Sequence, residues 1–182
     1  MRSQSILHRT HQTAIVKSLT VVSVALCLTI CALSQQMQRA GTTSAGDDTE
    51  IREMIAKYAK SVDGADTTLA SQVWLNSPDV SFIHPLGHEH GLDQIKENVY
   101  RRLMGDTFSE RRLTPRDISL HAYGDTAWAE FYWDFVAKFR KGGSPITTHG
   151  RETQVYRRTA NGWRLVHVHY SGMPVAEKEK GF

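Results

Sequence analysis

The segment from Gly150 to Pro174 constrains the fold of this chain more than any other part of it. It contains two runs of alternating β-branched, aromatic and polar residues, which are typical of β-strands, on either side of Asn161-Gly162. Both central positions of a type I′ turn need positive φ, and Asn followed by Gly meets that need. We therefore predict a tight antiparallel hairpin with strands over 147–158 and 163–171.

Two further strands are predicted before this hairpin, over 113–122 and 126–140, separated by short turns rich in glycine. Side chains alternate between the two faces of a strand, so every second residue from Ala127 to Phe139 shares one face. That face is apolar throughout, and it includes Phe131, Trp133 and Phe135. We expect helices to cover it.

The other face of strand 126–140 mixes aromatic and charged residues, among them Trp128, Tyr132 and Asp134. A monomer seldom leaves so broad a partly apolar sheet in water. We therefore expect the protein to associate with itself through this face, as a homodimer or a larger ring.

The first half of the chain has helical spacing. Ile51, Met54, Ile55 and Tyr58 recur on one face of a first helix. Asp47 is a candidate cap for it, with Glu50 completing a capping box. Asp66 begins a shorter second helix, a short strand follows at 80–84, and a third helix follows Gly91. Helices first and a strand meander afterwards indicate an α+β fold.

The N-terminus has the composition of a secretory signal. Residues 1–34 contain Arg2, Arg9 and Lys17, no acidic residue, and an apolar run that ends at Ala32-Leu33-Ser34. We predict a signal peptide over 1–34, a flexible leader over 35–46, the domain over 47–175 and a frayed tail over 176–182. The protein is then exported, periplasmic or extracellular. The alternative is an uncleaved segment that anchors the chain to a membrane.

Charge and cysteine content exclude several classes of function. Both cysteines, Cys27 and Cys31, lie in the signal segment, so the mature domain has no disulfide and no thiol nucleophile. Removing that segment leaves 19 of the 22 basic residues against 19 acidic ones, and the net charge is then zero. We expect no nucleic-acid partner, because that binding depends on excess positive charge.

The chain resembles the nuclear transport factor 2-like superfamily in its SnoaL-like branch. Its second half is similar to the association (hub) domain of calcium/calmodulin-dependent protein kinase II. The matching residues are Gly91-Leu92-Asp93, Glu152-Thr153, Val155, Arg157-Arg158, Trp163, Val166-His167, His169, Ser171-Gly172 and Pro174. This motif is a specific marker of the fold. It is a weak marker of function, because the superfamily includes scaffolds, isomerases, dehydratases and cyclases.

The resemblance implies a cone, in which a curved antiparallel sheet wraps against three N-terminal helices and leaves a pocket at its open end. The hub domain lines this pocket with basic side chains. The corresponding positions here are Ile95, Trp133, Gln154 and Tyr170, and none of them carries a full charge. Such a pocket suits an apolar or aromatic molecule rather than an anion. The expected ligand-binding residues are Ile95, Phe131, Trp133, Phe135, Gln154, Tyr156 and Tyr170.

Glu152 is the candidate general base, because a carboxylate among aromatic residues loses hydration and its pKa rises. Tyr58 and His84 are candidate donors to an oxyanion formed by proton abstraction. The alternative is that a basic neighbour such as Arg151 or Arg158 neutralises Glu152, which is then only structural.

Histidines form two clusters, His84 with His88 and His90, and His167 with His169. Two His-x-His pairs could supply four metal ligands, but no complete metal motif is present. His88 and His90 fall in an expected hairpin loop. We predict no metal and no other cofactor.

Three functions remain open. The first is an exported, oligomeric protein that binds a small molecule without turnover. The second is a cofactor-free isomerase, dehydratase or cyclase that uses Glu152 as its base. The third is a pure self-assembly module whose cone is filled by its own side chains.

Overall fold

The computed structural model describes residues 43–173, and the predicted signal peptide and C-terminal tail lie outside them. The described residues form one compact unit. None of their helices is both long and apolar enough to cross a bilayer.

The three predicted helical regions are present. They are α2 (Ala45–Gly64), α3 (Thr67–Val73), and α4 (Gly91–Gln94), which continues directly into the π-helix η1 (Ile95–Asp106). Asp66 caps α3 as expected, by accepting from the backbone of Thr68 and Leu69. The expected cap at Asp47 is wrong, because Ser44 caps α2, and the helix starts before the predicted domain boundary at residue 47.

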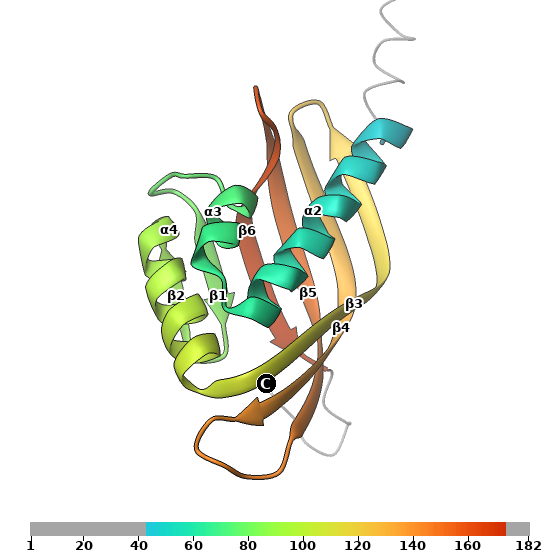
Figure 1. Cartoon of the computed structure of the whole chain (residues 1–182). Helices are drawn as coiled ribbons and strands as arrows, with labels where there is room; N and C mark the ends of the chain where they lie inside the picture. Colours follow the sequence, from blue (N-terminus) through green and yellow to red (C-terminus); the bar gives the residue numbers. More distant parts are fainter. Residues whose placement is uncertain (1–42, 174–182) are drawn as a thin grey trace, which may run out of the picture. The chain divides into compact units, whose positions relative to one another are not determined.

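The sheet has six strands in the order β2-β1-β6-β5-β4-β3, and it curves around α2 without closing (Figure 1). The strands are β1 (Ser81–His84), β2 (Gly87–His90), β3 (Phe108–Tyr123), β4 (Thr126–Phe139), β5 (Ile146–Thr159) and β6 (Gly162–Gly172). β3 to β6 form the expected antiparallel meander, while β1 pairs with β6 in parallel. The sheet is therefore mixed, because it holds this parallel pair beside antiparallel ones.

The closing hairpin is held to α2 by the acidic residues expected to cap that helix. Glu50 Oε1 accepts from the backbone N–H of Trp163 at 2.9 Å, and Asp47 Oδ1 accepts from its indole N–H at 3.2 Å. Gly162 has φ 85°, and a Cβ there would lie 2.3 Å from Glu50 Oε1. The prediction of a type I′ turn is wrong, because that turn needs positive φ at both central residues and Asn161 is not among the described residues with positive φ.

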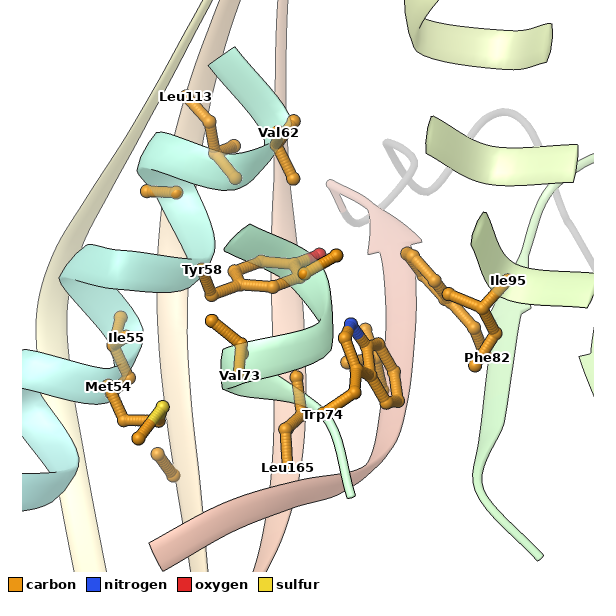
Figure 2. Packing of buried hydrophobic residues seen from close by; sticks show 14 of the residues in the cluster. Met54, Ile55, Tyr58, Val62, Val73, Trp74, Phe82, Ile95, Leu113 and Leu165 are labelled. Carbon is orange, nitrogen blue, oxygen red and sulfur yellow. The ribbon is translucent and has the colours of Figure 1, made fainter. Parts of the chain in front are cut away.

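The core lies between α2 and the inner face of the sheet. Tyr58 reaches from α2 into its centre, near Val73 and Trp74 (Figure 2). The inner residues of β4 are buried as the alternation predicted: Phe131, Trp133 and Phe135 are at most 8% exposed. Burying a large apolar side chain contributes about 1.5–3 kcal/mol, so this face is a main source of stability.

The outer face of β4 is mixed, as predicted. Trp128 stacks on Tyr123 with ring centroids 5.3 Å apart. Tyr132 and Val136 are 39% and 43% exposed, and the Arg116 guanidinium lies 5.3 Å from the Tyr132 ring centre. Asp134 also lies on this face, where it contacts Arg116 and His149 at 3.1 and 2.5 Å.

Candidate functional site

A cavity of about 250 Å³ lies between the inner face of the sheet and the helices. Its wall is mostly apolar, and it receives side chains from α2, η1 and strands β1, β3, β4, β5 and β6. The lining includes residues for which the sequence predicted no role in the site: Leu103, Met104, Phe108, Leu113, Ile146 and Thr148. Phe108 lies outside the strand predicted over 113–122, because β3 begins at Phe108.

All three candidate catalytic residues, Glu152, His84 and Tyr58, line this cavity. Of the seven expected ligand-binding residues, Trp133, Phe135 and Tyr170 also line it. Ile95, Phe131, Gln154 and Tyr156 are buried in the core and are not part of the lining.

The cavity floor is organised by cross-strand rows on the inner face. Glu152 is paired with Phe131 on one side and Tyr170 on the other. In the next row Trp133 faces Gly150, which has no side chain. A Cβ at Gly150 would lie 2.0 Å from Trp133 Cζ2, so the glycine is what allows the indole to lie across β5. The indole thereby stacks on Tyr170, with centroids 4.6 Å apart.

Glu152 is an acidic group held in the core. It is 3% exposed, and burial raises its pKa to about 8, while hydrogen bonds from Gln154 and Tyr58 partly oppose that shift. Gln154 Nε2 donates to Glu152 Oε1 at 2.6 Å, and the Tyr156 hydroxyl donates to Gln154 Oε1. Glu152 thus ends a buried chain of hydrogen bonds on the inner face of β5, and neither Arg151 nor Arg158 is paired with it among the described contacts.

Three tyrosines surround this acid. Tyr58 of α2 is buried, and desolvation together with the nearby Glu152 raises its pKa well above the usual range. Burial and the same carboxyl group also raise the pKa values of Tyr156 and Tyr170. All three hydroxyls therefore keep their protons across the neutral range.

His84 lies on β1 next to a second carboxylate. Its Nδ1 accepts from the backbone N–H of Leu86 at 3.3 Å, and its Nε2 lies 3.5 Å from Glu89 Oε1. Asn98 Nδ2 in turn donates to Glu89 Oε2 at 2.6 Å. These contacts fix the orientation of the imidazole at the cavity wall. The spacing of residues in the sequence could not predict that orientation.

The other histidines lie away from this cavity. His88 and His90 lie in strand β2, so their expected placement in a loop is wrong. His167 and His169 flank the buried inner residue Val168 on β6, and His88 and His90 are paired with the two residues that flank the buried Phe82 on β1. All four side chains therefore lie on the outer face. Within residues 43–173 no group of three or more potential ligands is arranged to hold a metal ion.

The fold and the cavity define a class, namely α+β proteins in which a curved sheet and its helices enclose a small apolar chamber. Residues 51–176 match the model of the SnoaL-like domain, and the chain belongs to that family within the nuclear transport factor 2-like superfamily. None of the curated proteins matches the sequence.

Solved structures agree with this assignment. A nuclear transport factor 2-like superfamily protein from Salmonella enterica is 47% identical, with a TM-score of 0.71, and the match covers 74% of this chain and 96% of that one. A protein described as a putative dehydratase from Streptomyces avermitilis is 20% identical, with a TM-score of 0.64 and coverage of 73% and 100%.

A third structure, described as a putative scytalone dehydratase from Novosphingobium aromaticivorans, is 14% identical, with a TM-score of 0.63 and coverage of 70% and 85%. At this identity, the likeness to the two dehydratases shows the fold alone.

The raised pKa of Glu152 makes stability depend on pH. The folded protein keeps a proton up to about pH 8, whereas an unfolded glutamate loses it near 4.5. Between these values the folded state binds more protons, so the free energy of unfolding falls by about 1.4 kcal/mol per pH unit from this group. Glu152→Gln stays neutral at every pH. The free energy of unfolding of this variant should therefore rise relative to that of the wild type between pH 5 and 8. Urea unfolding at several pH values measures this, and a constant difference would contradict it.

Proposed function

We propose that this protein is an exported member of the superfamily that binds an apolar or aromatic small molecule in the cavity, without turnover. The observation that carries the proposal is the cavity itself, about 250 Å³ in volume and walled by aromatic and aliphatic side chains. A cone filled by its own side chains would have no such space, and this argues against a pure assembly module. Export is supported by the composition of residues 1–34.

Thr148 offers a test of where the ligand binds. It lines the cavity yet is itself exposed, so a larger side chain there obstructs the cavity without entering the core. We expect Thr148→Trp to weaken binding of 2-ethylnaphthalene by about tenfold or more, or about 1.4 kcal/mol. Equilibrium dialysis measures this affinity.

The matched control is Thr147→Trp, because Thr147 is also exposed and its side chain points to the opposite face of β5. This variant should bind as the wild type does. If both variants bind equally well, the ligand lies elsewhere. If the wild type binds neither 2-ethylnaphthalene nor its ketone analogue 2-acetylnaphthalene, the proposed function is wrong.

Acid–base catalysis is the second candidate. It is favoured by one observation, the meeting of a buried acid with a pKa of about 8 and the side chains of Tyr58 and His84 in a single cavity. Ionised Glu152 would take a proton from the carbon beside a carbonyl group. The electron pair of the broken C–H bond would form a C=C bond to the carbonyl carbon, and the π pair of the C=O bond would move onto the oxygen, where the two other side chains can donate to it.

Hydrogen exchange in D2O tests this candidate. The acetyl methyl protons of 2-acetylnaphthalene should exchange faster with the protein present, at a rate per bound molecule that rises as pH passes through about 8. The rise is expected because only the carboxylate form of Glu152 accepts the proton. NMR measures the exchange, and an effect that survives in Glu152→Gln would assign the base to another group.

We also propose that two copies associate through the outer face of β4. The support is the partial exposure of Tyr132 and Val136 beside the stacked Trp128. Sedimentation equilibrium of residues 43–182 should give a dimer or larger species, and Val136→Lys should shift it toward monomer. A wild-type protein that is monomeric at micromolar concentration would contradict the proposal.

A further inference from the structure

Six of the seven histidines in residues 43–173 lie on the outer face of the sheet, and the seventh, His84, lines the cavity on the inner side. The six come from four different strands, so the fold gathers them on one face and no local motif does. They are His88, His90, His121, His149, His167 and His169.

Four of these histidines are neighbours across β2, β1 and β6. The ring centroids of His88 and His90 are 4.0 Å apart. Ser81 of β1 is paired with both His90 and His167, and its hydroxyl oxygen lies 2.7 Å from His167 Nδ1. Burial lowers the pKa of His167, and the nearby His169 and His88 lower it further. Positive charge therefore accumulates in this cluster only against mutual repulsion.

The other two histidines lie beside the residues of β4 through which we propose that two copies associate. His121 stacks on Trp128, with ring centroids 4.9 Å apart. His149 Nδ1 donates to Asp134 Oδ1 at 2.5 Å. A change of charge on either ring would therefore be felt within the proposed contact.

The fixed charges of the outer face are nearly balanced at neutral pH. Its basic side chains are Arg112, Arg116, Lys138, Arg151, Arg157 and Arg164. Its acidic side chains are Glu110, Asp117, Glu130 and Asp134. The remaining titratable groups on this face are Tyr123 and Tyr132.

Most of the acidic residues are already compensated. Asp117 and Asp134 contact Arg116, and Glu110 contacts Lys138. Among the described contacts only Glu130 of this face has no cation partner. Protons taken up by six histidines would therefore add positive charge that the face itself cannot neutralise.

The face is self-complementary as long as the histidines are neutral. A twofold interface brings the same surface together from both copies. Glu130 and Arg151 line a polar hollow of about 380 Å³ on this face, so Arg151 of one copy can pair with Glu130 of the partner subunit. His169 lines the same hollow, and a proton on it would add a positive charge close to Arg151.

We propose that the outer face of the sheet is a pH-sensitive interface between two copies of this chain, which separate when its histidines gain protons. The inference rests on the self-association proposed above and adds what controls it. Histidine is the side chain that ordinarily changes charge between pH 5 and 8. In a twofold dimer each new charge faces a surface that has gained the same charges. The dimer then binds fewer protons than two separate copies, so its dissociation constant rises as pH falls.

Sedimentation equilibrium of residues 43–182 at pH 8 and pH 5.5 tests this. We expect the dissociation constant to rise about 100-fold at the lower pH. This corresponds to one histidine per copy whose pKa is lowered by about one unit in the dimer, at about tenfold each. At pH 5.5, raising NaCl from 0.05 to 0.5 M should restore part of the dimer, because salt screens the repulsion. Near-UV circular dichroism checks that the protein stays folded.

Variants assign the effect to the histidines. Replacing the two histidines of β6 together, by His167→Gln and His169→Gln, removes two titrating groups at partly exposed positions and keeps a polar side chain beside Ser81. The rise in the dissociation constant should then shrink to about tenfold or less. The matched control is His84→Gln, which removes the inner-face histidine and should leave the pH dependence of association as in the wild type.

The outcomes separate this inference from the self-association beneath it. A protein that is monomeric at both pH values overturns both. A dimer with the same dissociation constant at pH 8 and pH 5.5, or a tighter one at pH 5.5, overturns the inference and leaves the interface. An undiminished pH effect in the double variant also overturns it. A dimer that weakens with acid in the wild type and in His84→Gln, but much less in the double variant, supports the inference.

Discussion

The apolar inner face of a strongly curved sheet has to be covered, and much of the molecule follows from how α2 covers it. Alternation along β4 places Phe131, Trp133 and Phe135 on that face, where water would be excluded only if a helix lay across it. Near the start of the helix, Asp47 and Glu50 accept hydrogen bonds from the two N–H groups of Trp163 and so hold the helix to the sheet. A straight helix cannot follow a curved sheet along its whole length. The space that remains where sheet and helices diverge is the cavity.

Within that space, a few small structural choices decide the chemistry. Gly150 removes a side chain where Trp133 must cross β5, and the indole reaches Tyr170 as a result. Glu152 follows in the next row, desolvated by the same aromatic wall. Its hydrogen-bond partners, Gln154 and Tyr58, are both neutral, so the acid is oriented without an opposite charge beside it. An apolar wall and a proton-bearing acid thus come from the same packing.

The family assignment fits this picture and leaves the chemistry to individual residues. A Salmonella protein of the superfamily shares 47% identity over most of this chain, whereas the two structures described as dehydratases share only the fold. Fold likeness at that level does not carry a reaction from one protein to another. The cavity and the side chains that line it are therefore the main evidence about function in this chain.

By itself, the sequence determined the α+β class, the existence of four long strands, and the face to which each residue of β4 belongs. It could do so because alternation and helical periodicity are local properties of the chain. That parity placed Phe131 inward and Asp134 outward. The tertiary structure alone decided that β1 pairs in parallel with β6, and that Gln154 and Tyr156 support the acid from the core instead of lining the cavity. It also brought Thr148, Leu113 and Phe108 to the wall. These facts depend on pairing between distant segments and on how far each side chain extends, and neither is encoded in the spacing of neighbouring residues.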